Sequence, residues 1–349
     1  MRRALPDLGT VCTRAELMKL AGRDDVEARV VVNQRGRWSL IEGPLRTADF
    51  RSLPATGWTL LVQGVNLYSA AADTLLRRFA FLPYARLDDL MVSYAVPGGG
   101  VGPHYDSYDV FLLQGAGRRR WCWGRQSDLA LKADVPLKIL RRFAPQHEAV
   151  LRQGDLLYLP PSYAHHGIAL TECTTYSIGF HAPAHDELAQ AFLDFLRDRC
   201  APPVRYADPD LVPTREPARI GRAMQEEVWR VLARIRWDRA ATNHFLGSFL
   251  SEPKAVVVFT RPSRQLARPI FAARIAKSGV HLDRRTQLLY DRAALYVNGE
   301  AHPWPAGKRN LLSSLANTRT LGSRAAAALS EQQMQFLHDG YNNGFLHIG

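Results

Sequence analysis

Two histidines and an aspartate are placed where they can bind one metal ion. His104 and Asp106 form an H-x-D motif directly after a glycine-rich segment, residues 97–103. Residues two apart in a strand share a face, so both side chains can reach the same ion. His165, which follows an apolar run and a Pro-Pro turn, is the second histidine. Two histidines and one carboxylate cover one face of an octahedral iron(II), as in non-haem iron oxygenases, and leave positions open for 2-oxoglutarate and dioxygen.

Three other features bear on this metal site. Zinc competes by affinity, but a closed zinc site needs a fourth protein ligand, and none is placed for it. His166 is adjacent to His165, and only one of the two should point inward from an extended segment, so His166 is the alternative ligand. A second H-x-D motif, His281-Leu282-Asp283, lacks a preceding glycine loop and a comparable later strand ending in histidine, and we expect it on the surface.

A run of three arginines can supply the cation that a dicarboxylate co-substrate needs. Residues 118–120 are all arginine, and a guanidinium grips a carboxylate with two parallel hydrogen bonds. On a strand, Arg119 faces away from Arg118 and Arg120. We expect two of the three to belong to a solvated edge.

The composition excludes several classes of protein. With 349 residues, the chain is long enough for two or three domains. No segment approaches the roughly 20 consecutive apolar residues of a membrane span, and no apolar stretch follows the early arginines, so we expect a cytoplasmic protein. The cysteines form no C-x-x-C pair, which argues against zinc fingers and disulfides. We expect packing roles for Cys12, Cys122, Cys173 and Cys200.

The positive charge is concentrated in the C-terminal part of the chain. The net charge is +12, and residues 201–349 contain 21 Lys+Arg and 12 Asp+Glu, which gives +9. A basic region can attract RNA or a ribosome surface. However, no stripe of Lys and Arg interleaved with aromatic residues is present, so we favour a solvated arginine-rich surface over direct nucleic-acid binding.

The sequence of the first 200 residues predicts a β domain with helices around it. Thr13 and Glu16 fit a capping box that starts a short helix. Residues 28–43 read as a hairpin, and a helix is expected around residues 70–81. Between residues 87 and 182, short β runs separated by turns predict a sandwich or small barrel. These runs are residues 90–96, 108–113, 118–123, 155–159 and 174–180, and a helix begins at Asp186.

The sequence of the remaining residues predicts helices followed by a winged-helix-like unit. Five prolines lie in or next to residues 201–216, which we take as a linker. Apolar residues at helical spacing predict helices at 220–235 and around 245–250, and such a stripe can be core or a dimer seam. A β pair at 287–297 precedes a helix that Ser330 begins and Gly340 can end.

Four stretches of the sequence resemble the JmjC-type ribosomal oxygenases of the cupin superfamily. The resemblance is to the bacterial branch, which hydroxylates an arginine of large-subunit ribosomal protein sixteen. It covers nearly the whole chain. It rests on DDLM (residues 88–91), PGGGVGPHYDSYDVFLLQGAGRRRW (97–121), GDLLYLPPSYAHHG (154–167) and YSIGFHAP (176–183).

The resemblance implies a fold, a chemistry and roles for individual residues. It implies a double-stranded β-helix catalytic domain at residues 1–200, a helical dimerisation region at 201–262 and a winged-helix-like domain at 263–349. It implies iron(II) as cofactor, 2-oxoglutarate and dioxygen as co-substrates, a ribosomal-protein substrate and a homodimer. The implied iron ligands are His104, Asp106 and His165; Arg119 would bind the 2-oxoglutarate carboxylate, with Thr175 and Ser177 as further polar contacts.

Some positions depart from the family pattern, and some alternatives stay open. Ala95 and Thr175 stand where the family pattern has a serine and an asparagine, and His166 replaces an acidic residue. The metal ligands do not determine the substrate. Histidine hydroxylation and lysine demethylation use the same chemistry and therefore remain alternatives. A non-catalytic cupin scaffold that holds metal and binds ribosomal or nucleic-acid partners is the alternative from another class.

Overall fold

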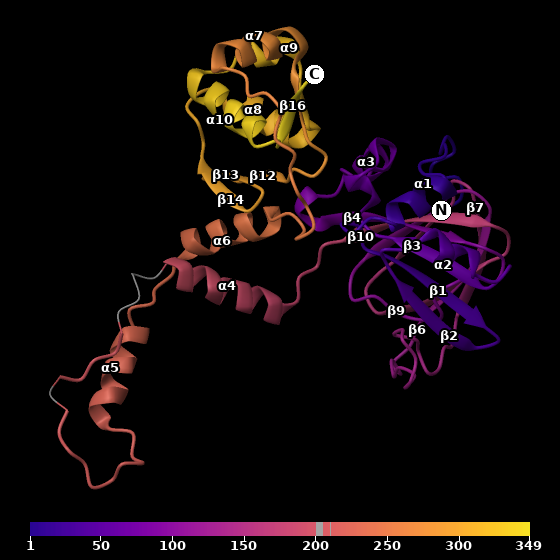
Figure 1. Ribbon diagram of the computed structural model, residues 1–349, viewed down its shortest axis with the longest axis horizontal. Coiled ribbons are helices and arrows are strands. Elements are labelled where there is room, and N and C mark those ends of the chain that lie inside the picture. The colour runs from indigo at the N-terminus through magenta and orange to yellow at the C-terminus, as the bar shows by residue number, and fades with distance from the viewer. Residues whose placement is uncertain (200–204, 210) are drawn as a thin grey trace.

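The computed structural model describes residues 1–199, 205–209 and 211–349. It shows a β-rich core, a set of three helices and a separate C-terminal domain formed by the elements from α7 to β16 (Figure 1). Cys200 and the first residues of the expected linker lie outside the described residues. Within the described ranges, no helix combines the length and the apolar character needed to cross a lipid bilayer.

The N-terminal elements add strands and helices to one edge of the core. The expected capping box is present: Thr13 accepts from the amide of Glu16, whose carboxylate accepts from the amide of Thr13. The predicted hairpin and the predicted helix near residue 70 are also confirmed. One strand, β3, was not predicted from the sequence. The elements are α1 (Arg14–Ala21), β1 (Ala28–Gln34), β2 (Arg37–Glu42), α2 (Thr47–Arg51), β3 (Trp58–Val62), η1 (Val65–Leu67), α3 (Ala70–Arg77) and η2 (Tyr84–Arg86).

Two antiparallel sheets form the β core, as expected for a cupin-type fold. The larger sheet has the strand order β2-β1-β3-β4-β10-β5-β8, and the smaller has β7-β6-β9. Apolar side chains from both sheets fill the interior, and Leu60, Leu90, Leu113 and Ile178 are fully buried. The strands after β3 are β4 (Leu87–Ala95), β5 (Val110–Gln114), β6 (Arg118–Arg125), β7 (His147–Arg152), β8 (Leu156–Leu159), β9 (Tyr163–Ala169) and β10 (Cys173–Phe180).

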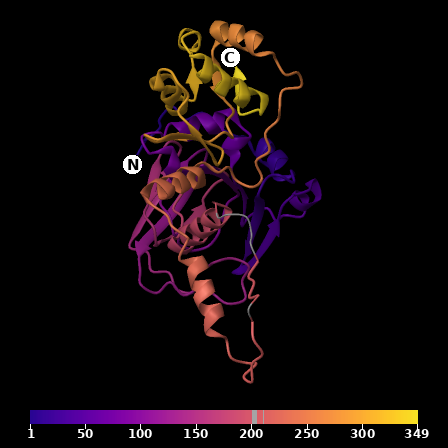
Figure 2. The same cartoon turned by 90° about the vertical axis from the view of Figure 1, so that its left-hand side faces the viewer.

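Three helices connect the core to the C-terminal domain. α4 (His185–Arg199) packs on α6 (Arg239–Ser251) through aromatic contacts, such as Phe192 on Phe245 with ring centroids 5.1 Å apart. α5 (Arg222–Leu232) buries none of its residues. Figures 1 and 2 both show α5 extending away from the rest of the molecule as an arm.

The C-terminal domain has its own apolar core, built around Phe271, Ile275, Leu295, Leu312 and Leu315. The β pair expected at 287–297 is confirmed. The prediction that Gly340 ends the last helix is wrong, because α10 continues to Asn342. The elements are α7 (Arg268–Ser278), β11 (Val280–Leu282), β12 (Leu288–Tyr290), β13 (Ala294–Val297), β14 (Glu300–Pro303), α8 (Arg309–Thr318), β15 (Thr320–Leu321), α9 (Ser323–Ala326), α10 (Glu331–Asn342) and β16 (Leu346–Ile348).

Candidate active site

His104, Asp106 and His165 meet at one end of the core. His104 stands at the end of the glycine-rich loop, and its backbone pairs with that of His165 on β9 through two hydrogen bonds of 3.0 and 2.8 Å. One potential ligand atom from each of the three side chains lies within 4.8 Å of the others. The Nε2 atom of His165 is 3.6 Å from Asp106 Oδ2. Among the described residues, this is the one His/Cys/Asp/Glu group with such metal-binding geometry.

Backbone carbonyls orient both imidazoles for metal binding. The Nδ1 atom of His104 is 2.9 Å from the carbonyl oxygen of Gly102, and that of His165 is 2.9 Å from the carbonyl oxygen of Tyr163. Each Nδ1–H therefore donates to a carbonyl, which leaves the two Nε2 atoms as neutral ligands. Burial, followed by the proximity of His104, lowers the pKa of His165 to about 3. The His165 ring is thus uncharged near pH 7 and ready to bind a cation.

His166 lies apart from this group. It is next to His165 on the same strand and therefore faces the other way, toward Phe143, with ring centroids 6.3 Å apart. The geometry favours His165 over His166 as a metal ligand.

The glycine loop is close to β9, and side chains would not fit there. A Cβ on Gly100 would lie 2.3 Å from the carbonyl oxygen of Gly167, and one on Gly99 would lie 2.1 Å from that of Trp58. Neither distance is possible for real atoms, so both glycines are needed for the close approach. This approach brings the H-x-D motif next to His165.

Arg119 is a buried cation without a carboxylate partner. Its side chain extends from β6 into the core and is 4% exposed, whereas Arg118 is exposed. Its Nη1 donates to Ser93 Oγ at 3.0 Å and to Thr175 Oγ1 at 3.1 Å. Its Nε has no hydrogen-bond partner in the described part of the chain, and burial lowers the pKa of the guanidinium. A buried, uncompensated guanidinium is costly, so its surroundings call for an anionic ligand.

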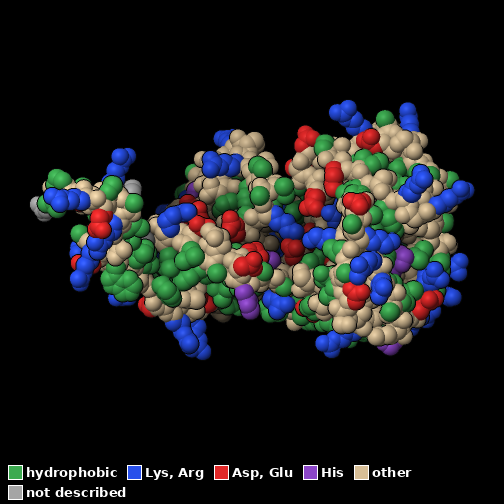
Figure 3. Space-filling view, turned by 90° about the horizontal axis from the view of Figure 1, so that it is seen from below, with side chains coloured by type: hydrophobic (Ala, Val, Ile, Leu, Met, Phe, Trp, Pro, Cys, Tyr) green, Lys and Arg blue, Asp and Glu red, His purple; other side chains and the backbone are tan. Residues whose placement is uncertain are grey.

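A cavity of about 760 Å³ contains the metal group and Arg119. Two more polar atoms in its lining, Thr59 Oγ1 and Trp121 Nε1, are buried without a partner among the described residues. Figure 3 shows a hollow near the middle of this face of the molecule, bordered by side chains of both charges. The cavity therefore offers the three ligands of a metal ion and polar donors for a dicarboxylate such as 2-oxoglutarate.

The two secondary residues expected from the sequence take different positions. Thr175 is buried and contacts Arg119 directly, as described above. Ser177 also lines the cavity, but the hydrogen bonds of Arg119 within the described residues go to Ser93 and Thr175. The sequence reasoning missed Ser93, which lies directly opposite Thr175 in the register of β4 and β10. Because Ser93 and Ala95 share a face of β4, Ser93 supplies the hydroxyl that Ala95 lacks.

The second H-x-D motif was expected on the surface, and this is wrong for Asp283. Its side chain is buried, and it accepts hydrogen bonds from Arg285 Nε and from His347 Nε2, both at 2.9 Å. The histidine that the sequence reasoning did not find is His347 on β16, which pairs with His281 on β11. Since a guanidinium already occupies the Asp283 carboxylate, this group is a structural ion-pair network rather than a metal site.

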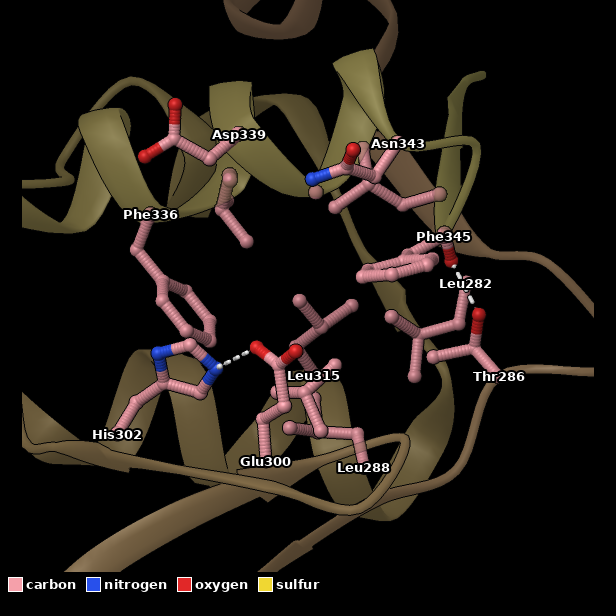
Figure 4. A pocket seen from close by; sticks show the side chains of 14 residues that line it. Leu282, Thr286, Leu288, Glu300, His302, Leu315, Phe336, Asp339, Asn343 and Phe345 are labelled. Atoms are coloured by element: carbon pink, nitrogen blue, oxygen red, sulfur yellow. Dashed lines mark hydrogen bonds and ion pairs between the residues drawn. The ribbon is translucent and has the colours of Figure 1, made fainter. Parts of the chain in front are cut away.

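A second, smaller cavity lies within the C-terminal domain (Figure 4). Its volume is about 120 Å³, and Leu288, Leu315 and Phe336 contribute to its apolar lining. The Nε2 atom of His302 lies 3.7 Å from a carboxylate oxygen of Glu300 at its border. It shares no lining residue with the cavity around Arg119.

Comparisons with known proteins match both the β core and the C-terminal part of the chain. Residues 74–188 match a family model described as a JmjC domain, and residues 234–347 match one described as a ROXA-like winged helix. Ribosomal protein uL16 3-hydroxylase of Escherichia coli is 38% identical over 242 residues, which cover 68% of this chain and 64% of that enzyme. A probable ribosomal oxygenase of Haemophilus influenzae is 32% identical, with 86% of this chain and 78% of that protein covered.

Solved structures of the E. coli ribosomal oxygenase YcfD extend the likeness over the full chain. One has a TM-score of 0.85 at 31% identity and covers 99% of this chain and 93% of that one. Another, in complex with cobalt and 2-oxoglutarate, has a TM-score of 0.83 at 30% identity and the same coverage. The predicted cofactor and co-substrate, iron(II) and 2-oxoglutarate, are thereby confirmed. The chain belongs to the JmjC-type ribosomal oxygenases, which are 2-oxoglutarate-dependent dioxygenases.

Proposed function

We propose that this protein hydroxylates an arginine side chain of large-subunit ribosomal protein sixteen. The observation that carries the proposal is the buried, unpaired Arg119 in the same cavity as His104, Asp106 and His165. A metal site and a carboxylate site in one cavity are what a metal-dependent reaction with 2-oxoglutarate needs. The relationship to the E. coli uL16 hydroxylase supports a ribosomal protein as the substrate.

Each residue of the cavity has a defined role in this proposal. His104, Asp106 and His165 hold the iron ion, and Arg119 binds the distal carboxylate of 2-oxoglutarate. Thr175 and Ser93 fix the guanidinium of Arg119 by accepting its hydrogen bonds. When bound, iron(II) supplies the activation of dioxygen that is coupled to decarboxylation of 2-oxoglutarate.

The chain's own side chains position the reactants and exclude water. Trp121 borders the cavity beside Arg119, with the guanidinium carbon 5.4 Å from the ring centroid, and shields the carboxylate site. Ser177 provides a further polar contact on the cavity wall. The neutral imidazole of His165 binds a cation without first losing a proton.

The charge of the cavity supports a cationic substrate side chain. Hydroxylation at carbon leaves a guanidinium positively charged, so substrate and product need the same counter-charges. The lining has six carboxylates and four Lys or Arg side chains, an excess of two acidic groups: Glu27, Glu42, Asp88, Asp89, Asp106 and Glu187 against Arg29, Arg119, Lys138 and Lys254.

We also propose that the protein is a homodimer that works in the cytoplasm, where ribosomal proteins are made. The arm is the candidate dimer surface, because α5 exposes large apolar side chains that a monomer leaves in water. Trp229 is 73% exposed, and Val228 and Leu232 are exposed beside it. Figure 3 shows hydrophobic side chains gathered on this side of the molecule. In this proposal, residues 201–262 form the dimerisation region between a catalytic domain (1–200) and a winged-helix-like domain (263–349).

Mass spectrometry tests the proposed reaction. Purified protein is incubated with iron(II), 2-oxoglutarate and a fragment of the ribosomal protein, and we expect one arginine of the fragment to gain one oxygen atom. His104→Ala should abolish the gain while the variant stays folded. Oxidation of a histidine instead, or loss of methyl groups from lysine, would refute arginine as the target. Absence of any oxidised fragment and of succinate, despite bound iron, would refute the enzymatic proposal altogether.

A further inference from the structure

Lys254 brings a positive charge from the helical region into the catalytic cavity. It lies three residues after the end of α6, and its Nζ atom is 2.9 Å from Asp89 Oδ2 and 3.0 Å from Asp88 Oδ1. All three residues line the cavity that contains the metal group. The two carboxylates of Asp88 and Asp89 are therefore already paired with a cationic side chain that belongs to the protein itself.

The carboxylate of Asp89 is held in a fixed place. Its side chain is buried, and its Oδ2 atom also accepts the amide hydrogen of Gly64 at 2.9 Å. Among the described residues, both hydrogen bonds of this carboxylate go to Oδ2. The Oδ1 atom faces Gly179 on β10, where a Cβ would lie 3.8 Å away. Since Gly179 has no side chain and lines the cavity, Oδ1 is on the side that a ligand can approach.

The two aspartates and the 2-oxoglutarate site share a strand. Asp88 and Asp89 lie on β4, five and four residues before Ser93, which holds Arg119. Asp88 is the more accessible of the pair, with 38% of its side chain exposed. Asp88 and Asp89 thus line the same cavity as the metal group, where a substrate side chain can contact them.

We propose that Lys254 determines substrate specificity by competing with the substrate's cationic side chain for Asp88 and Asp89. The inference rests on the proposed function, because it needs a cationic substrate. A buried carboxylate needs a cation nearby, and Lys254 supplies it in the free enzyme. A guanidinium has five donors in a planar fork and can bind two carboxylates with several hydrogen bonds, whereas an ammonium is a point charge. An arginine can therefore replace Lys254, and a neutral side chain cannot.

The test removes the competing charge and measures the kinetics of the full-length protein. Lys254→Met is compared with wild type on a ribosomal-protein fragment that contains the candidate arginine, and on the same fragment with citrulline, which is neutral and nearly the same size. We expect the KM for the arginine fragment to fall about fivefold, the scale of one partly exposed ion pair, with the effect on KM rather than on kcat. The KM for the citrulline fragment should be the same in the variant and in wild type.

Three further variants distinguish the loss of the Lys254 charge from other effects of the substitution. Lys254→Arg retains the charge and should keep a KM close to that of wild type. Lys254→Gln loses the charge but keeps a donor group, and it decides the matter if Lys254→Met fails to fold. Arg268→Met breaks an ion pair with Glu331 inside the C-terminal domain, outside the cavity, and should leave KM unchanged.

Two different results would overturn the inference. A KM that is unchanged or raised in both Lys254→Met and Lys254→Gln shows that Lys254 only joins the helical region to the core. If the wild type oxidises no arginine fragment, the proposed function fails first, and the role of Lys254 fails with it. Oxidation by wild type together with an unchanged KM in the variants refutes the role of Lys254 alone.

Discussion

At the scale of single residues, Arg119 is the informative side chain. It is a buried guanidinium whose protein partners are two neutral hydroxyl groups. In a protein without an anionic ligand, such a group lowers stability, because no interaction compensates for the hydration that the charge loses on burial. Its presence is therefore a sign of function at the expense of stability.

Arg119→Met should separate these two effects. Without ligand, we expect the variant to be at least as stable as wild type, because an uncompensated buried charge is replaced by an apolar side chain of similar length. In wild type, saturating 2-oxoglutarate with Mn(II) should raise the melting temperature, and this rise should vanish in the variant. Thermal unfolding with and without ligand measures both. A variant that is less stable without ligand, yet still stabilised by 2-oxoglutarate, would contradict this role.

Asp283 should make the C-terminal domain sensitive to acid. Although burial would raise its pKa, hydrogen bonds from His347 and Arg285 hold the pKa of this carboxyl below its usual value. As the pH falls below about 4, the unfolded chain takes up this proton before the folded domain does, so the domain loses stability. Asp283→Asn should remove this part of the acid dependence and cost about 1–2 kcal/mol at pH 7.

Hydrogen exchange of the β11 and β16 amides at pH 7 and pH 3.5 measures this loss of stability next to Asp283. Arg268→Met is the matched control, because it breaks a more exposed ion pair, with Glu331, in the same domain and leaves Asp283 and its partners in place. It should leave protection unchanged. An Asp283→Asn domain that loses as much protection on acidification as wild type would refute the assignment.

At the scale of elements, the approach of the glycine loop to β9 builds the metal site. Gly100→Ala forces the loop away from Gly167, two residues after His165, because the added Cβ would lie 2.3 Å from a backbone oxygen. We expect metal affinity to fall about tenfold to a hundredfold, as when ligands are misoriented. Calorimetric titration with Mn(II) measures it.

The control for this change is Gly221→Ala, where a Cβ would meet nothing within 4 Å. Its metal affinity should match that of wild type. Wild-type affinity in Gly100→Ala would show that the loop adapts and that the close approach is dispensable.

How far the sequence predicts these elements depends on the range of the interactions. The alternation at Arg119 is a local property of β6, and Arg119 points into the core as expected, whereas His104 and Asp106 lie in a loop in which only His104 pairs with β9. Of the core strands, β3, β7 and β9 were missed because they are recognised by their partners, β4 and β6, which are distant in sequence. Ser93 and Lys254 were missed for the same reason: each acts on a residue of another element, and the local sequence carries no sign of it.

At the scale of the whole molecule, the exposed arm is the proposed dimer surface. Trp229→Glu places a charge in the middle of the apolar face of α5 and should convert a dimer into a monomer, because burial of a carboxylate in an apolar interface is unfavourable. Light scattering coupled to gel filtration measures the mass. Phe81→Glu is the control, since Phe81 is 71% exposed on the catalytic core.

The wild type and the Phe81 variant should both have twice the mass of one chain. A monomeric wild type would contradict the proposed dimer, and so would a Trp229 variant that remains dimeric.

The central claim is that the His104 group and Arg119 form one site for iron(II) and 2-oxoglutarate. The most direct measurement is an anaerobic titration of the iron-loaded protein with 2-oxoglutarate, followed by the visible absorption that arises when 2-oxoglutarate chelates iron(II). We predict a saturable band in wild type, no band in His104→Ala, and a titration in Arg119→Met shifted to at least about thirtyfold higher 2-oxoglutarate, the effect of removing one partner of a buried charge pair. A wild type that holds iron but develops no band, or an Arg119→Met titration that matches wild type, would contradict the claim.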